Sequence, residues 1–346
     1  MTTRTALAGL CCVLSVVLGL VLAKPAGQRA ATGGKTVIGL SLDTLKEERW
    51  QHDRDLIVKA AADLGAEVLV QAANSDDTRQ IQDVEALISR KVAALVIVPH
   101  NGDAMAKAVR LAHEAGIPVI SYDRMIPNGG VDLHVAFDAV EIGRAQARWL
   151  VAHLTKGRAT KLVRIHGAKT DHNSHLVKQG QDEVLAPHFK SGAVTTLHED
   201  WADNWKPENA KKIMNAALTN HGNGLDAVLA ANDGTAGGAI QALLEEGLAG
   251  KVLVLGQDAE LAACQRVARG TQSMTIYKPL SLEATTAAAA AVKLARRQVI
   301  VAKQEVADPA GPVPAILMDV TAVDKSNLMD TVVKDGFHPK EAVFGK

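Results

Sequence analysis

The chain has 346 residues, of which 47% are hydrophobic and 3% aromatic, and its 38 basic residues balance its 38 acidic residues. This hydrophobic content excludes an intrinsically disordered chain, and the zero net charge gives no support for nucleic-acid binding, which usually needs a basic face. A chain of this length is expected to form about two domains, each large enough to bury its own core.

The first 23 residues have the features of a secretory signal peptide. Arg4 is followed by the apolar run LAGLCCVLSVVLGLVLA, which ends in a small residue, Ala23. We therefore predict a signal peptide over residues 1–23 and a leader over 24–34, with an uncleaved membrane anchor as the alternative. A lipoprotein signal is not favoured, because Leu10 stands before Cys11 where a small residue is expected.

Cleavage would leave Cys264 as the last cysteine, so we expect neither an intrachain disulfide nor a cysteine-based metal site. Its helical surroundings predict a small buried side chain.

Short apolar runs alternate with helix-period stretches along most of the chain, which is typical of βαβ units and a parallel sheet. The first half has strand candidates at 36–41, 67–72, 93–99, 118–123 and 134–138. The second half has strand candidates at 161–167, 193–198, 227–233, 252–258 and 273–278. The two series predict an α/β fold with two similar doubly wound lobes.

A helix candidate at 281–298 and a strand candidate at 314–323 follow the second series. We therefore expect the chain to cross between the lobes more than once, through a hinge of several strands. The first lobe is assigned residues 35–138 and about 279–304. The second lobe is assigned 139–278 and about 305–330, and residues 331–346 form a tail.

Polar side chains and scarce aromatic residues gather where the predicted strands end, and ligands of open parallel sheets bind beyond the carboxyl ends of the strands. The residues at these ends are Arg49, Trp50, Tyr122, Asp123, Arg124, Asp171, His172, Asn173, Trp201, Trp205, Asn232, Asp233, Gln257, Asp258, Tyr277 and Lys278. Five of the six Trp and Tyr residues lie here, with Trp149 the exception. We therefore expect these aromatic side chains to line one ligand cleft.

This mixture of side chains predicts a carbohydrate ligand. A pyranose packs its C–H faces on Trp or Tyr rings and pairs its hydroxyls with carboxylates, amides and guanidinium groups. A buried hydrogen bond contributes only about 0.5–1.5 kcal/mol net, whereas an unpaired buried group costs more, so such a site is stereospecific. Mixed acids and bases suit an uncharged polyol better than a phosphate.

Each position also has a purely structural interpretation. Trp50 shares a helical face with apolar residues and fits a core position. Residues 171–173 and 232–233 fit helix caps, and Arg124 and Lys278 fit turns at the surface.

Motifs of enzymes and cofactor sites are missing. The sequence has no G-x-G-x-x-G after its first strand, no phosphate-binding G-x-x-x-x-G-K-[ST], no G-x-S-x-G and no H-E-x-x-H. A calcium loop is also missing, and the 12 histidines are scattered. We expect a binding protein with no catalytic residues, no cofactor and no metal.

Several stretches resemble the D-xylose-binding family of type I periplasmic sugar-binding proteins. They are EERWQHDRD (47–55), SYDRMI (121–126), DNWKPENAKKIM (203–214), ANDGTAGGAIQAL (231–243), GQDAEL (256–261), GTQSMTIYKP (270–279) and VVKDGFH (332–338). The resemblance extends from about Lys35 to His338.

The resemblance implies two Rossmann-like lobes joined by three hinge crossings, with one sugar held between them. It further implies a monomer in the periplasm that delivers D-xylose to the membrane subunits of an ABC permease, with a chemoreceptor as a second partner. The family's ligand-binding positions match Arg49, Trp50, Arg124, Asn173, Trp205, Asn232, Asp258 and Lys278, to which we add Asp123.

The chain departs from the family at Asp171-His172-Asn173, where the family commonly has Asp-Asn-Asn, and this places His172 at the expected rim of the pocket. A broader aldose-binding protein of chemotaxis and sugar sensing is the alternative, since it shares YDR and GQDAE. It lacks a clear equivalent of 203–214, which favours D-xylose. A sugar-responsive transcription regulator would need a helix-turn-helix before the first strand, and residues 1–34 contain none.

Overall fold

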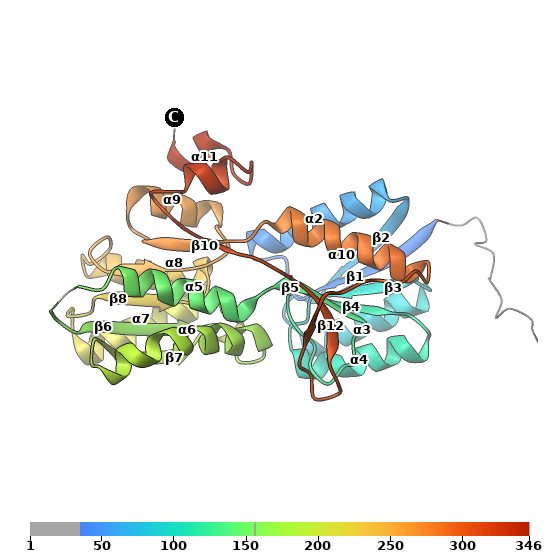
Figure 1. Cartoon of the computed structure of the whole chain (residues 1–346), viewed down its shortest axis with the longest axis horizontal. Coiled ribbons are helices and arrows are strands. Elements are labelled where there is room, and N and C mark those ends of the chain that lie inside the picture. The colour runs from blue at the N-terminus through green and yellow to red at the C-terminus, as the bar shows by residue number, and fades with distance from the viewer. Residues whose placement is uncertain (1–34, 156, 346) are drawn as a thin grey trace, which may run out of the picture. The chain divides into compact units, whose positions relative to one another are not determined.

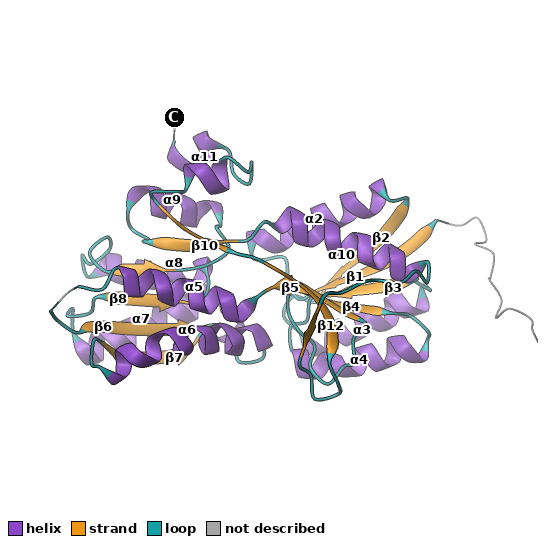
Figure 2. Ribbon diagram, in the orientation of Figure 1, coloured by secondary structure: helices purple, strands orange, loops and turns teal. Residues whose placement is uncertain are grey.

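The computed structural model describes residues 35–155 and 157–345. The expected signal peptide (1–23) and leader (24–34) lie outside the described residues. The elements below all belong to one unit that begins at Thr36. Within the described residues this unit contains two β-sheets, each carrying its own helices (Figures 1 and 2).

The first sheet has the strand order β11-β12-β5-β4-β3-β1-β2. Its strands are β1 (Thr36–Leu42), β2 (Ala66–Ala72), β3 (Ala94–Ile97), β4 (Val119–Tyr122), β5 (Leu133–Phe137), β11 (Gln304–Val306) and β12 (Val313–Met318). Only β11 pairs antiparallel to its neighbour among these described strands. Its helices are α2 (Glu48–Asp63), α3 (Asp77–Ser89), α4 (Gly102–Glu114) and α10 (Leu280–Ala295).

Helices cover both faces of this sheet. Successive side chains of a strand point to opposite faces, so a strand can pack against helices on both sides. On β3, Ala94 and Val96 belong to a buried cluster with α2 and α10. Leu95 and Ile97 belong to a second cluster with α3 and α4. The strand is therefore buried on both faces, which explains its continuous apolar sequence.

The second sheet has the order β13-β10-β9-β8-β6-β7. Its strands are β6 (Thr160–His166), β7 (Val194–Trp201), β8 (Ala227–Ala230), β9 (Leu253–Leu255), β10 (Met274–Tyr277) and β13 (Thr321–Asp324). Its helices are α5 (Ala139–Ala152), α6 (His172–Lys190), α7 (Pro207–His221), α8 (Asp233–Glu245) and α9 (Leu261–Arg269). The predicted α/β fold with two doubly wound lobes is confirmed.

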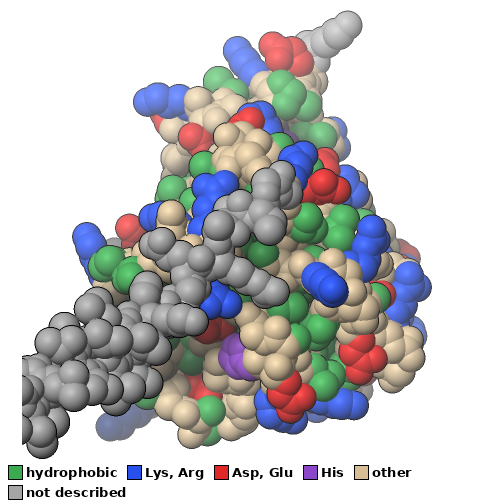
Figure 3. All heavy atoms as spheres, turned by 90° about the vertical axis from the view of Figure 1, so that its right-hand side faces the viewer, with side chains coloured by type: hydrophobic (Ala, Val, Ile, Leu, Met, Phe, Trp, Pro, Cys, Tyr) green, Lys and Arg blue, Asp and Glu red, His purple; other side chains and the backbone are tan. Residues whose placement is uncertain are grey.

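Three short helical segments complete the described chain: η1 (Asp203–Trp205), η2 (Met329–Val333) and α11 (Lys340–Phe344). None of the helices in residues 35–155 and 157–345 is long and apolar enough to cross a membrane. On the face shown in Figure 3, basic and acidic side chains are interspersed among apolar ones, as the balanced composition leads one to expect.

The single strand expected at 314–323 is wrong. β12 pairs in parallel with β5 in the first sheet, and β13 pairs antiparallel with β10 in the second. The assignment of 305–330 to the second lobe is therefore wrong for β12 and for the last two residues of β11. Asp319, at the change of sheet, is the only charged residue in the stretch 314–323. Because a single exposed charged residue is also common within a strand, the sequence does not reveal the break.

The described chain passes between the two sheets three times: from β5 to β6 through α5, from β10 to β11 through α10, and from β12 to β13. These passages agree with the three hinge crossings that the resemblance implies.

Candidate functional site

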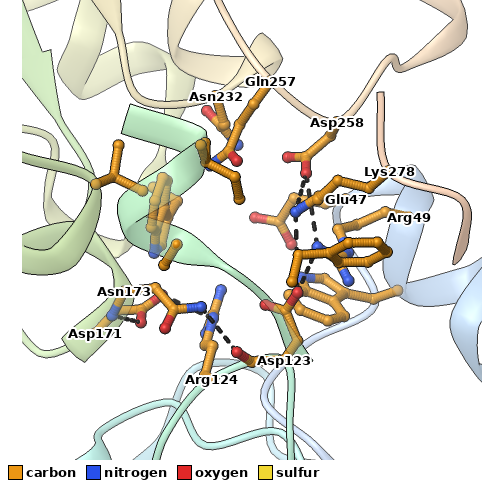
Figure 4. Close-up of a pocket in the computed structure, with 16 residues that line it drawn as sticks. Glu47, Arg49, Asp123, Arg124, Asp171, Asn173, Asn232, Gln257, Asp258 and Lys278 are labelled. Carbon is orange, nitrogen blue, oxygen red and sulfur yellow. Dashed lines mark hydrogen bonds and ion pairs between the residues drawn. The ribbon is translucent and has the colours of Figure 1, made fainter. Parts of the chain in front are cut away.

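One cavity collects polar side chains from the strand ends of both lobes (Figure 4). It holds about 500 Å³ of space free of protein atoms, part of which is open to solvent. The structure brings together every predicted site residue at this cavity: Arg49, Trp50, Asp123, Arg124, Asn173, Trp205, Asn232, Asp258 and Lys278.

The fold explains this convergence, because the carboxyl ends of parallel strands lie at the same edge of a sheet. From the first lobe, the first turn of α2 provides Arg49 and Trp50, and the residues after β4 provide Asp123 and Arg124. The second lobe provides Asn173 at the start of α6, Trp205 at the end of η1, Asn232 before α8, Asp258 after β9 and Lys278 after β10.

Arg49 is buried among four carboxyl groups. Its Nη1 lies 2.9 Å from Asp123 Oδ2 and 3.6 Å from Asp258 Oδ1. Its Nε lies 3.1 Å from Asp53 Oδ2, and its Nη2 lies 3.3 Å from Glu283 Oε2. Only 4% of the side chain is exposed, so these contacts hold the guanidinium in one orientation.

Two of the carboxyl groups around Arg49, Glu283 and Asp123, have pKa values shifted in opposite directions. Burial raises the pKa of Glu283 well above its ordinary value, and the Asp123 charge adds to this effect while Arg49 opposes it. Burial also acts to raise the pKa of Asp123, but Arg49, Lys278 and Arg124 outweigh it and lower that pKa to about 2. Near neutral pH, Asp123 is therefore ionised, and the shift of Glu283 favours its protonated form.

Lys278 completes a set of ion pairs at the centre of the cavity. Its Nζ lies 2.6 Å from Asp258 Oδ1 and 3.9 Å from Asp123 Oδ2. Together with Arg49, these residues alternate in charge, and they come from both lobes. The pairing leaves little net charge at the cavity wall.

Arg124 links the lobes at a second place. Its Nη1 donates to Asp43 Oδ2 at 2.7 Å and to the carbonyl of Pro99 at 3.1 Å. Its Nε lies 2.8 Å from Asp171 Oδ2 of the second lobe. Beside it, the Nδ2 of Asn173 donates to the carbonyl of Asp123 at 2.9 Å.

Two Trp rings line the cavity. The guanidinium carbon of Arg49 lies 4.1 Å from the centre of the Trp50 ring, and that of Arg124 lies 6.0 Å from the centre of the Trp205 ring. Trp205 is buried, and its Nε1 has no hydrogen-bond partner among the described residues. Gly167 makes room for this indole, since a Cβ at that position would lie 2.2 Å from Trp205 Cη2.

The expectation that five Trp and Tyr residues line one cleft is wrong for Tyr122, Trp201 and Tyr277. The hydroxyl of Tyr122 donates to Asp53 behind the cavity. The Trp201 ring packs against two histidines, and Tyr277 packs against Phe337. These side chains stand at strand ends but point away from the cavity.

The structural interpretations of the site residues hold in part. The Oδ1 of Asn232 accepts from the backbone N–H of Thr235 at 2.8 Å and caps α8, and Asn232 still borders the cavity. Trp50 is 3% exposed and belongs to the core as well as to the cavity wall. Arg124 and Lys278 are buried rather than at the surface.

Asp171 and Gln257, which the sequence places at strand ends, also line the cavity. Sequence reasoning missed the other lining residues: Glu47, Phe137, Ala139, Ile142 and Val177. The apolar residues come from β5, α5 and α6, and their spacing is that of ordinary core positions. His172 borders an adjoining cavity with His134 instead of this one, so its expected place at the pocket rim is wrong.

Cys264 is buried, as expected. Among residues 35–155 and 157–345, no group of three or more His, Cys, Asp and Glu side chains is arranged to hold a metal ion.

Comparisons with known proteins agree with this geometry. Residues 38–298 match the family model described as a periplasmic binding protein domain. The chain is 44% identical over 332 residues to a D-xylose-binding periplasmic protein of Haemophilus influenzae, covering 96% of this chain and 99% of that one. It is 45% identical over 309 residues to the D-xylose-binding periplasmic protein of Escherichia coli, covering 89% and 93%.

A solved structure is also similar. It is a carbohydrate transporter solute-binding protein of Chloroflexus aurantiacus in complex with D-glucose. The TM-score is 0.84 at 30% sequence identity, and the match covers 88% of this chain and 97% of that one.

Replacing Glu283 with Gln tests the proton balance around Arg49. The pKa of Glu283 is higher in the folded protein than in the unfolded chain, where it is near 4.5. The contribution of this carboxyl to stability is therefore complete below the unfolded-state pKa and is lost as pH rises through the folded-state pKa. Glu283→Gln should therefore stabilise the sugar-free protein at pH 8 and have little effect at pH 4.5. The gain should be about 1.4 kcal/mol for each pH unit that the titration spans.

Thermal unfolding at both pH values measures this difference. Glu85→Gln, at an exposed position of α3, is the matched control and should be neutral at both. A destabilisation by Glu283→Gln that grows from pH 4.5 to pH 8 would contradict the assignment of the proton to Glu283.

Proposed function

The chain belongs to the family of periplasmic binding proteins, and from this membership we propose that it captures D-xylose between its two lobes and delivers it to an ABC importer. The observation that carries this proposal is the charge-balanced set of Arg49, Asp123, Asp258 and Lys278 beside two Trp rings in one cavity. The relatives that are 44–45% identical are described as D-xylose-binding periplasmic proteins, which supports the choice of sugar.

An uncharged polyol fits the chemistry of this wall. Arg49, Arg124 and Lys278 supply N–H donors, and the carboxylates of Asp123 and Asp258 supply acceptors. A phosphate or a second carboxylate would meet these carboxylates at close range and be repelled. The hydroxyls of a pyranose both donate and accept, so they pair with either kind of group.

The roles of Asn232 and of the two Trp residues follow from their contacts. Because the Oδ1 of Asn232 caps α8, its amide N–H₂ is the part left to donate to a hydroxyl. The rings of Trp50 and Trp205 offer faces for the sugar's C–H groups, and the unpaired Nε1 of Trp205 is a further donor.

The apolar part of the wall supports a pentose. Phe137, Ile142 and Val177 border the cavity without any side-chain hydrogen-bonding group. A hydroxymethyl group directed at these residues would bury a hydroxyl without a partner, at a cost of about 1–3 kcal/mol. D-xylose lacks this group.

In transport, the three passages between the sheets act as the hinge, and contacts to both lobes let a bound sugar stabilise their closed arrangement. We infer that the permease recognises this arrangement, with a chemoreceptor as a second partner. The predicted signal peptide at 1–23 would deliver the chain to the periplasm, where it acts as a monomer.

Titration calorimetry of the purified protein with D-xylose, D-ribose, L-arabinose and D-glucose tests the function. D-xylose should bind with the lowest Kd, in the micromolar range or below. If D-glucose or D-ribose binds more tightly than D-xylose, the chain is instead a broader aldose-binding protein. The absence of heat from all of these sugars at millimolar concentration would contradict the sugar-binding function itself.

Two Trp substitutions at the same end of the second lobe distinguish an effect on the cavity from an effect on the surrounding structure. Trp205→Ala removes one stacking face and should weaken D-xylose binding at least 100-fold, about 2.7 kcal/mol. Trp201→Ala, which removes a ring outside the cavity, should keep the Kd within about threefold. Circular dichroism checks that both variants are folded, and an unchanged Kd in Trp205→Ala would remove this residue from the site.

A further inference from the structure

The loop after β9 places Asp258 in the cavity by means of an unusual backbone. Asp258 has φ of 101° and Ala259 has φ of 49°. Residues other than glycine rarely adopt positive φ, and such a strained backbone persists only where contacts with the surrounding structure hold it in place. The contacts that hold this loop therefore decide where the Asp258 carboxylate lies.

The N–H groups of the loop are held from inside the second lobe. The acceptors are the carbonyl of Ile276 at 2.8 Å for Asp258, Thr275 Oγ1 at 3.1 Å for Ala259 and Asp233 Oδ2 at 3.1 Å for Glu260. Each of these contacts involves β10 or the start of α8. They fix one side of the loop to the sheet.

The opposite side of the loop is held by a residue from the far end of the chain. The carbonyl of Ala259 accepts a hydrogen bond from His338 Nε2 at 2.8 Å. Ala259 is fully buried and His338 is 4% exposed, so water has little access to replace this donor. Cys264 Sγ also approaches the same carbonyl, at 3.3 Å, but a thiol is a weaker donor.

The segment that carries His338 is itself anchored. Gly336, with φ of 74°, turns the chain before Phe337. The Phe337 ring packs edge-on against Tyr277, with centroids 5.2 Å apart. It also lies 6.2 Å from the ring of His52 on α2 of the first lobe. Beyond it, the Nε2 of Gln265 donates to the carbonyl of Ala342 at 2.8 Å and ties α11 to α9.

Burial lowers the pKa of His338, so its ring is neutral near pH 7. A carbonyl only accepts, and the contact with Ala259 therefore places the ring proton on Nε2. The imidazole is held as a neutral donor, aimed at the loop from a segment that reaches across to α2.

We propose that His338 is a positioning residue for sugar binding: its N–H fixes the strained loop at Ala259 and thereby sets the position of the Asp258 carboxylate against Arg49 and Lys278. This role rests on the proposed function of the cavity. Through His338, the stretch VVKDGFH at 332–338 contributes to sugar binding although it lies outside the cavity.

Three variants test this role by D-xylose calorimetry and thermal unfolding without sugar. His338→Leu removes the donor and keeps most of the volume, and it should raise the Kd about 10-fold. His338→Gln places an amide N–H near the position of Nε2 and should stay within about threefold of the parent. Gln265→Ala loosens the same segment without touching the loop, so its Kd should be unchanged even where its melting temperature falls.

An unchanged Kd in His338→Leu would overturn the proposal, and so would a His338→Gln variant as weak as His338→Leu, because packing alone would then explain the loss. If His338→Leu does not fold, His338→Gln and His338→Asn decide, since the shorter Asn cannot place its amide at the same point. We expect only His338→Gln to preserve the Kd, and equal Kd values for His338→Gln and His338→Asn would overturn the positioning role of His338. Failure of the parent protein to bind D-xylose would contradict the proposed function instead.

Discussion

The contacts of Arg49 with its surrounding carboxyl groups are the interaction on which the rest of the cavity depends. A buried guanidinium without partners would cost several kcal/mol, so its place in the fold requires the carboxylates around it. Asp123 comes from the first lobe and Asp258 from the second, and both lie within 3.6 Å of Nη1. The same charges that stabilise Arg49 thus orient the acceptors that the proposed sugar would use.

This arrangement also connects the site with movement of the lobes. The ion pairs between Arg49 and Asp258 and between Arg124 and Asp171 join elements that belong to different sheets. Any change in the angle between the lobes alters these distances. In the proposed function, sugar hydroxyls share these same groups, and the free energy of binding is therefore coupled to the arrangement of the lobes.

Strand ends made the polar half of the site predictable, because parallel strands direct their carboxyl ends to one edge whatever the details of packing. Side-chain direction was not predictable in this way: Tyr122 points to Asp53, while its neighbour Asp123 points to Arg49. The change of sheet after Met318 and the burial of Glu283 also had no distinctive local sequence, since a single exposed Asp in a strand and a glutamate in a helix are both common. The contact of His338 with Ala259 joins residues 79 apart in the chain and depends on the complete fold.

A crystal structure of the protein with D-xylose tests the central claim most directly. The account predicts electron density for one pyranose in contact with the Trp50 and Trp205 rings, with hydroxyls within hydrogen-bond distance of Arg49, Asp258 and Lys278. A sugar bound elsewhere, or one that contacts neither ring and leaves the Arg49 ion pairs untouched, would contradict it.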